Sequence, residues 1–194
     1  QYRFWFRRSG ILEQTNAQRR LVRATLDGET FADMHLSADV RIEGLDGVTF
    51  RVSPDGDSYY AFVVILPDHP LYKTYFPPEV QQEVVAANYT AGDTFTSALG
   101  WPMAVLVRVE SGKVTVLRGI RLFENPTKGT WARMQVKVKG DLIQAAVKID
   151  KPAVYVGARD AALAEGGVGF FTDRSKGAFK NLEVWDAPQM MRVL

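Results

Sequence analysis

The sequence predicts an all-β protein built as a sandwich or barrel of antiparallel strands. Apolar and polar residues alternate with a period of two in many short segments, and turn signals rich in Gly, Pro and Asp separate these segments at regular spacing. Helical patterns are confined to residues 77–89, where Pro77-Pro78 suits a helix start, and to a short stretch at 158–165. Many short strands with little helix are typical of sheet packed on sheet.

Two segments show the alternation most clearly. Residues 34–42 predict a strand with one apolar and one solvated face, and residues 132–140 repeat the pattern. Residues 142–149 follow after Gly140-Asp141, which predicts a hairpin. The side chains that share the apolar faces are Met34, Leu36, Ala38, Val40 and Ile42, then Ala132, Met134, Val136 and Val138. Further strands are expected at 9–14, 21–26, 48–53, 59–66, 103–110, 113–120, 168–173 and 179–185.

The segment from 67 to 102 breaks this rhythm, because it is rich in proline and aromatic residues. An excursion of this length between sheet strands is unusual in a compact domain and is often functional. The alternative is a lid that covers a sheet edge or completes the core. No internal repeat or low-complexity linker divides the 194 residues, so we expect a single domain, 1–194, with an insertion at 67–102.

Composition excludes several classes of function. The chain has 24 basic and 22 acidic residues, so its net charge of +2 gives no basis for nucleic-acid binding. It has no cysteine and only two histidines, which excludes disulfides, thiolate metal sites and a multi-histidine zinc site. No apolar run is long enough to span a membrane. The first residues, Gln-Tyr-Arg, lack a methionine, and we expect a processed or trimmed product, potentially part of a larger protein.

Several motifs together resemble a known superfamily. They are FADMHLSADVRIEG (31–44), GVTFRVSPDGDSYYAFVV (47–64), GTWARMQVKVKGDLIQAAVKI (129–149) and GGVGFFTDRSKGAFKNLEVW (166–185), preceded by SGILEQ (9–14). The sequence resembles the concanavalin A-like lectin/glucanase superfamily, within it the laminin-G-like and 3-keto-disaccharide hydrolase group. The resemblance implies a jelly-roll β-sandwich of two antiparallel sheets.

The catalytic motifs of that superfamily are missing. No Glu-x-Asp-x-x-Glu strand is present, and residues 61–65, where the hydrolase-like group places acidic and amide residues, are apolar. No catalytic residue is therefore assigned, and enzyme activity stays open. The function expected first is a non-catalytic carbohydrate-binding domain of an exported protein (periplasmic, cell-surface or secreted), with an oligo- or polysaccharide as partner. The alternatives are a glycoside hydrolase similar to 3-keto-disaccharide hydrolases and a laminin-G-like protein-interaction domain.

Candidate ligand-binding residues come from the 47–64 hairpin and the 67–102 segment. Alternation with Val48 and Phe50 puts Arg51 on the opposite sheet face, where its guanidinium could bind a sugar or form an ion pair with Asp39 or Glu110. One of two adjacent tyrosines should be core and the other a platform for a sugar ring. The residues nominated are Arg51, Tyr60, His69, Tyr72, Tyr75 and Trp101.

Asp55 and Asp57 are weak candidates for a metal site. Two carboxylates around Gly56 are typical of a turn, and a calcium site needs more oxygen ligands than they supply. Calcium stays a candidate cofactor only because it is common in the superfamily. Trp131 and Trp185 lie in the structural motifs and are expected in the core.

Overall fold

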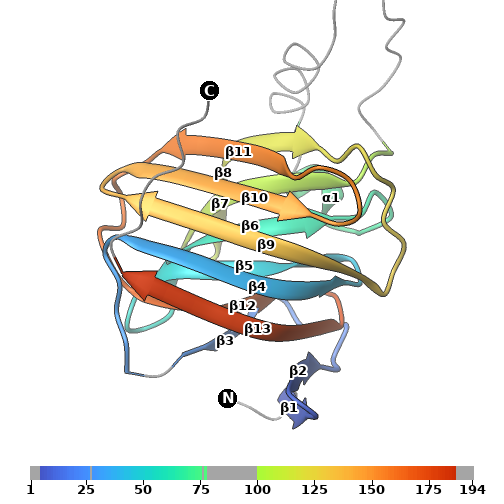
Figure 1. Ribbon diagram of the computed structural model, residues 1–194, viewed down its shortest axis with the longest axis horizontal. Helices are drawn as coiled ribbons and strands as arrows, with labels where there is room; N and C mark the ends of the chain where they lie inside the picture. The colour runs from blue at the N-terminus through green and yellow to red at the C-terminus, as the bar shows by residue number, and fades with distance from the viewer. Residues whose placement is uncertain (1–4, 27, 76, 78–99, 187–194) are drawn as a thin grey trace, which may run out of the picture.

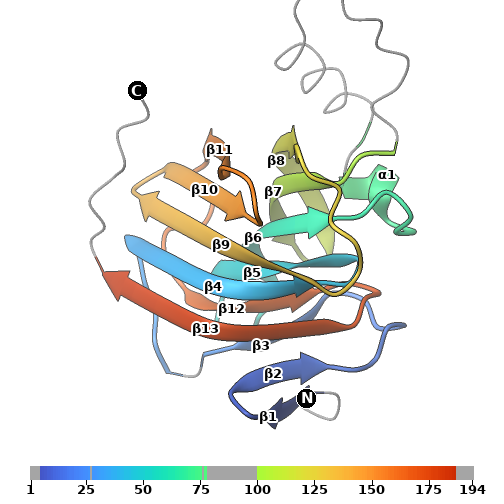
Figure 2. The ribbon, with the colours of Figure 1, turned by 45° about the vertical axis from the view of Figure 1, so that its right-hand side comes forward.

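The computed structural model describes residues 5–26, 28–75, 77 and 100–186. These residues form two antiparallel sheets packed face to face, as the two views in Figures 1 and 2 show, which confirms the expected β-sandwich. No helix in this part of the chain is long and apolar enough to cross a membrane.

Seven strands form the sheet nearer the viewer in Figure 1, in the order β1-β2-β13-β4-β9-β10-β11. Their bounds are β1 Trp5–Arg8, β2 Ile11–Gln14, β4 Met34–Ile42, β9 Thr130–Lys139, β10 Leu142–Lys148, β11 Val154–Arg159 and β13 Gly177–Asp186. Six strands form the other sheet, in the order β3-β12-β5-β6-β7-β8. Their bounds are β3 Val22–Thr25, β5 Leu45–Val52, β6 Ser58–Ile65, β7 Met103–Glu110, β8 Lys113–Arg121 and β12 Gly167–Thr172. A four-residue helix, α1 Tyr72–Tyr75, follows β6.

The core lies between the two sheets, where the alternation places it. The apolar residues predicted on β4 and β9 are all buried there, and β13 adds Phe179, which stacks on Phe170 of β12 at 4.6 Å between ring centroids. Each large side chain buried in this way contributes roughly 1.5–3 kcal/mol of hydrophobic free energy. The alternation predicted for residues 34–42 and 132–140 is thus confirmed.

β6 is buried on both of its faces, as its apolar sequence indicates. Tyr60, Phe62 and Val64 point into the core between the sheets. The alternate residues form a second apolar cluster on the outer face of the six-stranded sheet, and Leu71 and α1 pack against this cluster. The described start of the 67–102 segment therefore covers part of that face.

Two elements differ from the sequence expectation. Residues 154–159 form strand β11 rather than the start of a helix, and residues 160–165 contain no helix. Strand β1 pairs with β2 and extends the seven-stranded sheet at one edge. The helix expected at 77–89, and most of the insertion around it, lie outside the described residues.

Candidate functional site

The six side chains nominated from the sequence lie in two separate places. Arg51 and Tyr60 lie where β5 ends and β6 begins. The other four lie beyond the far end of β6: His69, Tyr72, Tyr75 and Trp101. The length of β6 separates the two groups, so they do not line one common site.

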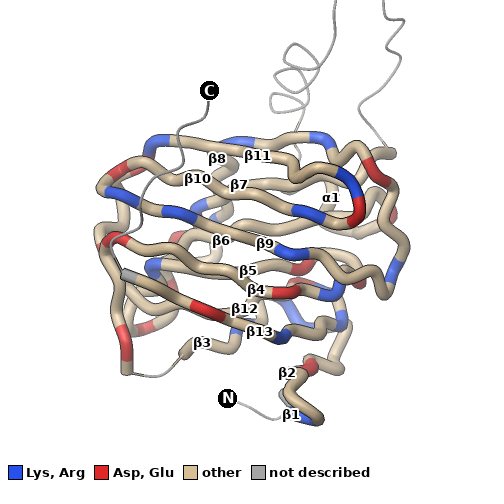
Figure 3. The backbone as a smooth tube through the Cα atoms, viewed as in Figure 1, with Lys and Arg blue, Asp and Glu red and all other residues tan. Residues whose placement is uncertain are grey.

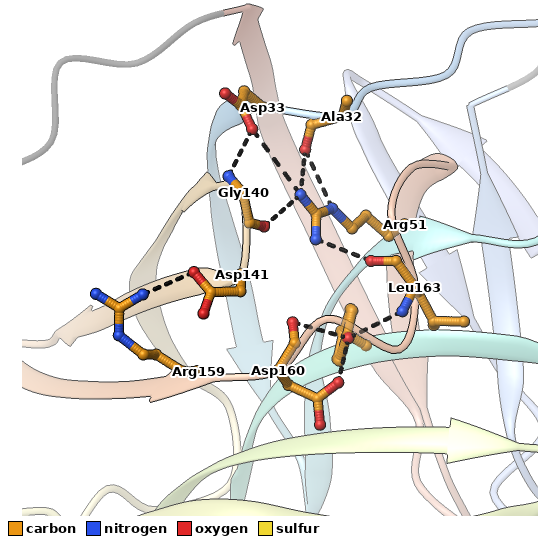
Figure 4. Close-up of polar contacts among 9 residues, drawn as sticks. Ala32, Asp33, Arg51, Gly140, Asp141, Arg159, Asp160 and Leu163 are labelled. Atoms are coloured by element: carbon orange, nitrogen blue, oxygen red, sulfur yellow. Dashed lines mark hydrogen bonds and ion pairs between the residues drawn. The ribbon is translucent and has the colours of Figure 1, made fainter.

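Arg51 is buried, and its side chain holds three loops together by hydrogen bonds. Only 2% of its surface is exposed, and four of its N–H groups donate to backbone carbonyls (Figure 4). Nε and Nη2 donate to Ala32, Nη2 also to Gly140 at 2.8 Å, and Nη1 to Leu163 at 2.8 Å. The Asp33 carboxylate lies 3.9 Å away and balances the charge.

The structure does not place Arg51 on an open sheet face, and its partners are neither Asp39 nor Glu110. The physical reason is its backbone, which has φ of +48° in the left-handed region. This conformation interrupts the extended strand, so the rule of alternating faces no longer applies there. The side chain turns instead toward the β9–β10 turn and toward the β3–β4 and β11–β12 connections, which cross from one sheet to the other.

Tyr60 is fully buried and stacks on Phe50 at 5.4 Å between ring centroids. Its hydroxyl donates to Asp160 Oδ1 at 2.5 Å and accepts from the Leu163 N–H at 3.2 Å. Burial and the hydrogen bond to Asp160 raise the pKa of Tyr60 to about 12. Asp160 also pairs with Arg108. Tyr60 therefore anchors the 160–163 loop and offers no exposed ring to a sugar.

The second group is also packed into the protein. His69 is 7% exposed, and its Nδ1 accepts the Leu71 N–H at 3.2 Å, which leaves the proton of the neutral ring on Nε2. Burial is the main cause that lowers the pKa of His69. Tyr72 and Tyr75 belong to the outer apolar cluster. Burial raises the pKa of both tyrosines.

Trp101 is half-buried. The Tyr72 hydroxyl donates to its carbonyl at 2.6 Å, and the Arg121 guanidinium lies over its indole ring. One face of the ring is therefore already occupied by a cation–π contact.

Asp55 forms a turn. Its Oδ1 accepts from Ser53 Oγ at 2.5 Å and from the Asp57 N–H at 2.9 Å. Within the described ranges no group of three or more His, Asp or Glu side chains is arranged to hold a metal ion.

The outer faces of the two sheets differ in chemistry. The face of the six-stranded sheet is apolar and covered in its centre. The face of the seven-stranded sheet is polar, with positive and negative residues interspersed along its strands (Figure 3). Trp185 and Tyr155 lie on it with 47% and 54% of their surfaces exposed. The seven-stranded sheet therefore offers the more accessible surface for a hydrophilic ligand.

Strand register arranges that surface into two neighbouring rows, which we call the polar strip. The first row crosses five strands: Trp185, His35, Lys137, Gln144 and Gly157. The second row crosses the same strands: Glu183, Ser37, Gln135, Ala146 and Tyr155. An exposed aromatic ring thus stands at each end, four strand spacings or about 19 Å apart.

Two side chains in the middle of the polar strip each have one buried polar atom. His35 Nε2 and Gln144 Oε1 have no hydrogen-bond partner among the described residues. Burial and the positive charges of Lys137 and Arg133 lower the pKa of His35, so its ring is neutral at pH 7. The His35 ring also leans on Trp185, with 5.0 Å between centroids.

Charged groups fix one side of the strip. Arg133 donates to Ser37 Oγ at 2.6 Å, to Asp39 at 3.2 Å and to Glu183 at 3.2 Å. Asn181 donates to the other Asp39 oxygen at 2.6 Å. This network holds the strip's border rigidly, because each carboxylate bonds to a neighbouring strand.

The expectation that Trp131 and Trp185 lie in the core is wrong. Trp185 is exposed, and Trp131 is half-buried on the outer face beneath Lys180, whose Nζ lies 4.3 Å from the ring centroid. The signal was present in the sequence: Ala132 and Met134 point inward, so Trp131 must point outward. Tyr155 follows the same rule, since Val154 and Val156 are buried.

Comparisons with known proteins support the fold. No protein-family model matches the chain, and no curated protein matches its sequence. The carbohydrate-binding module CBM66 from Bacillus subtilis has a similar structure, with a TM-score of 0.64 and 13% identity over 93% of this chain and 89% of that one. The xyloglucan-locus protein GH43B of Bacteroides ovatus gives a TM-score of 0.58 and 11% identity over 96% of this chain and 35% of that one.

A third match is the CBM2 module of the evolved Dit protein of Lactobacillus casei BL23 phage J-1, with a TM-score of 0.53 and 8% identity over 93% of this chain and 77% of that one. At these identities the likeness shows the fold alone. The chain is a β-sandwich of the kind found in carbohydrate-binding modules and glycan-related proteins, consistent with the superfamily that its motifs resemble.

Proposed function

We propose that this chain is a non-catalytic carbohydrate-binding domain that binds an oligo- or polysaccharide along the polar strip. The observation that carries the proposal is the pair of exposed aromatic side chains, Trp185 and Tyr155, at opposite ends of the polar strip, one in each of its two rows. Aromatic rings pack on the apolar faces of sugar rings, while amide and hydroxyl groups hydrogen-bond to sugar hydroxyls.

The strip has the dimensions and the chemistry for an extended chain. A separation of about 19 Å between its aromatic ends favours an oligosaccharide over a single sugar. Between them, Gln135 and Lys137 offer an amide and an ammonium group to sugar hydroxyls, and Gln144 and neutral His35 lie beside them on the same face. Little ordering entropy is lost on binding, because the groups stand on strands of one sheet.

The proposal includes the context of the domain. We place the domain in the periplasm, at the cell surface or among secreted proteins, as a single unit within a larger protein. The similarity of its fold to that of carbohydrate-binding modules supports a carbohydrate ligand.

Trp185→Ala and Tyr155→Ala test the site. Each substitution should weaken binding of a polysaccharide ligand about tenfold, because it removes the ring on which a sugar packs. Affinity electrophoresis against a panel of soluble polysaccharides identifies the ligand, and titration calorimetry with a derived oligosaccharide measures the loss. Stability should change by less than about 1 kcal/mol, since both side chains are largely exposed.

Phe123→Ala is the matched control. Phe123 is 63% exposed but follows β8 of the other sheet, so its loss should leave binding unchanged. Full affinity in the Trp185→Ala, Tyr155→Ala double variant would contradict the site. Turnover of a 3-keto glycoside would favour the hydrolase alternative, and a folded sample that binds no glycan would favour a protein partner.

A further inference from the structure

A cleft of about 610 Å³ lies on the opposite side of the sandwich from the polar strip. It lies beside β3, the edge strand of the six-stranded sheet, and beneath the turn between β5 and β6. Arg19, Arg20, Arg23, Glu29 and Asp55 supply the charged groups that line it. We call this hollow the arginine cleft.

Two of its guanidinium groups have no carboxylate within ion-pair distance in the described ranges. None of the ion pairs found in the described ranges includes Arg20 or Arg23. The Arg23 guanidinium lies over the Tyr59 ring, with 4.2 Å from Cζ to the ring centroid, and this contact holds it in place. Its Nη1 is buried and has no hydrogen-bond acceptor within the part of the chain that is described. Its Nη2 lies beside Gly56, which also lines the cleft.

The acidic groups of the cleft do not neutralise these arginines. Asp55 uses its Oδ1 to accept from Ser53 and from the Asp57 backbone, which fixes it within its own turn. These hydrogen bonds, and to a smaller extent the charge of Arg23, hold the pKa of Asp55 below its usual value. Among the described residues that line the cleft, three arginines therefore stand against two carboxylates.

The lining also distinguishes the cleft from a neutral sugar site. None of the described residues that line it is aromatic, so it offers no ring on which a sugar could pack. It does offer hydroxyl groups, from Thr25, Thr30 and Ser53, beside the guanidinium groups. A guanidinium group can donate two parallel hydrogen bonds to a carboxylate, and a hydroxyl group can hydrogen-bond to the hydroxyls of a sugar ring.

We propose that the arginine cleft is a second binding site, which takes a uronic acid residue through its carboxylate on Arg20 and Arg23. The cleft volume falls in the usual range for small-molecule sites and exceeds what a bare carboxylate would fill. The sugar ring would occupy the rest of the hollow, against Leu26 and Pro54 and within reach of the hydroxyl groups. Charge, rather than stacking, selects the ligand.

Titration calorimetry with glucuronic acid, glucose and glucose 6-sulfate tests the proposal. Glucuronic acid should bind saturably, more weakly as salt is added, and glucose should not bind. Arg23→Gln should weaken binding at least about tenfold, because it removes charge-assisted hydrogen bonds. Arg20→Gln should also weaken it. Since Arg20 is exposed, that variant serves as the test if Arg23→Gln perturbs the packing on Tyr59.

Lys113→Gln removes the same charge at the exposed turn between β7 and β8 and should bind glucuronic acid as the unmodified protein does. Equal binding of glucose and glucuronic acid would overturn the proposal. So would absence of binding to the folded protein, or unchanged affinity in Arg20→Gln and Arg23→Gln. Strong binding of glucose 6-sulfate without glucuronic acid would overturn the assignment to a carboxylate.

Amide chemical shifts locate the ligand independently. Gly56 and Gly167 line the cleft, so their amide signals should move on addition of glucuronic acid. Gly157 lies in the polar strip and should not respond. The two sites are also separable by substitution: Trp185→Ala and Tyr155→Ala should leave glucuronic acid binding unchanged, so either proposal can fail without the other.

Discussion

Replacing Arg51 with alanine is expected to lower the free energy of unfolding by about 3–5 kcal/mol, because it removes a buried guanidinium and the hydrogen bonds that this group donates to three loops. The carbonyls of Ala32, Gly140 and Leu163 would each lose a charge-assisted hydrogen bond, and Asp33 would lose its nearby cation. These groups belong to three loops that the Arg51 side chain links to one another. Urea unfolding followed by fluorescence measures the change.

Two further substitutions distinguish the effect of the hydrogen bonds that the guanidinium donates from the effect of its positive charge. Arg51→Lys keeps the charge but cannot reach three carbonyls with a planar fork, so its stability should fall between those of Arg51→Ala and the unmodified protein. Arg159→Ala removes an exposed arginine that pairs with Asp141, and it should cost less than about 1 kcal/mol. Equal effects of Arg51→Ala and Arg159→Ala would contradict the role of Arg51 in holding the three loops together.

Asp46 should make the protein less stable as pH rises from about 4 to 8. The carboxyl is fully buried, and the N–H groups of Glu43 and Gly44 donate to its Oδ2 at 2.7 and 2.9 Å, joined by Ser175 Oγ at 3.2 Å. Burial raises its pKa from 3.8 to about 7, because desolvation of the charged form outweighs these hydrogen bonds.

The sign follows from proton binding. Between pH 4 and 7 the folded state holds a proton on Asp46 that the unfolded state has released, so raising the pH favours unfolding. The stabilisation by this proton is complete below the unfolded pKa and is lost as pH rises through about 7. A shift of this size corresponds to roughly 4 kcal/mol. Burial raises the pKa of Asp173 to about 6, which adds a change of the same sign.

Asp46→Asn should flatten this pH dependence and raise stability above pH 7. An asparagine oxygen can accept from the Glu43 and Gly44 N–H groups, as the Asp46 carboxyl does, without placing a charge in the core above pH 7. Urea unfolding from pH 4.5 to 8.5 measures the free energy of unfolding against pH for Asp46→Asn and for the unmodified protein.

Asp150→Asn changes an exposed residue, so its free energy of unfolding should depend on pH as that of the unmodified protein does. His35 and His69, whose pKa values are lowered, contribute with the opposite sign near pH 6. Both histidines are present in all variants, so the difference between curves reports Asp46. Parallel curves for Asp46→Asn and the unmodified protein would show that Asp46 does not carry the effect.

Much of the fold was predictable because most strands are regular. In an extended strand, side chains alternate between faces, so Met34 to Ile42 and Ala132 to Val138 reveal the core directly. Strand β11 was missed because residues around 158–165 also fit a short helix. Residues 154–159 form a strand because their backbone groups hydrogen-bond to β10, and the local sequence does not reveal this pairing.

The candidate site was harder to predict because it depends on which strands are neighbours. Trp185 and Tyr155 are thirty residues apart, and they share a surface because β4, β9 and β10 lie between β13 and β11. Asn181, with φ of +53°, interrupts β13 before Trp185, so alternation counted along β13 from Phe179 fails at that point. The aromatic residues that looked most suited to a sugar, Tyr60 and Tyr75, are buried.

By itself, the sequence determined the class of fold, the inward face of each regular strand and the absence of disulfides, since these follow from local periodicity and composition. Only the tertiary structure decided which polar groups are exposed. Arg51 is conspicuous in the sequence, yet its guanidinium is buried and donates hydrogen bonds to three carbonyls from loops that are distant in the sequence. Arg23 is inconspicuous, yet it lies in a cleft over Tyr59. The physical reason is that burial and hydrogen-bond partners are properties of long-range contacts, which a local pattern does not contain.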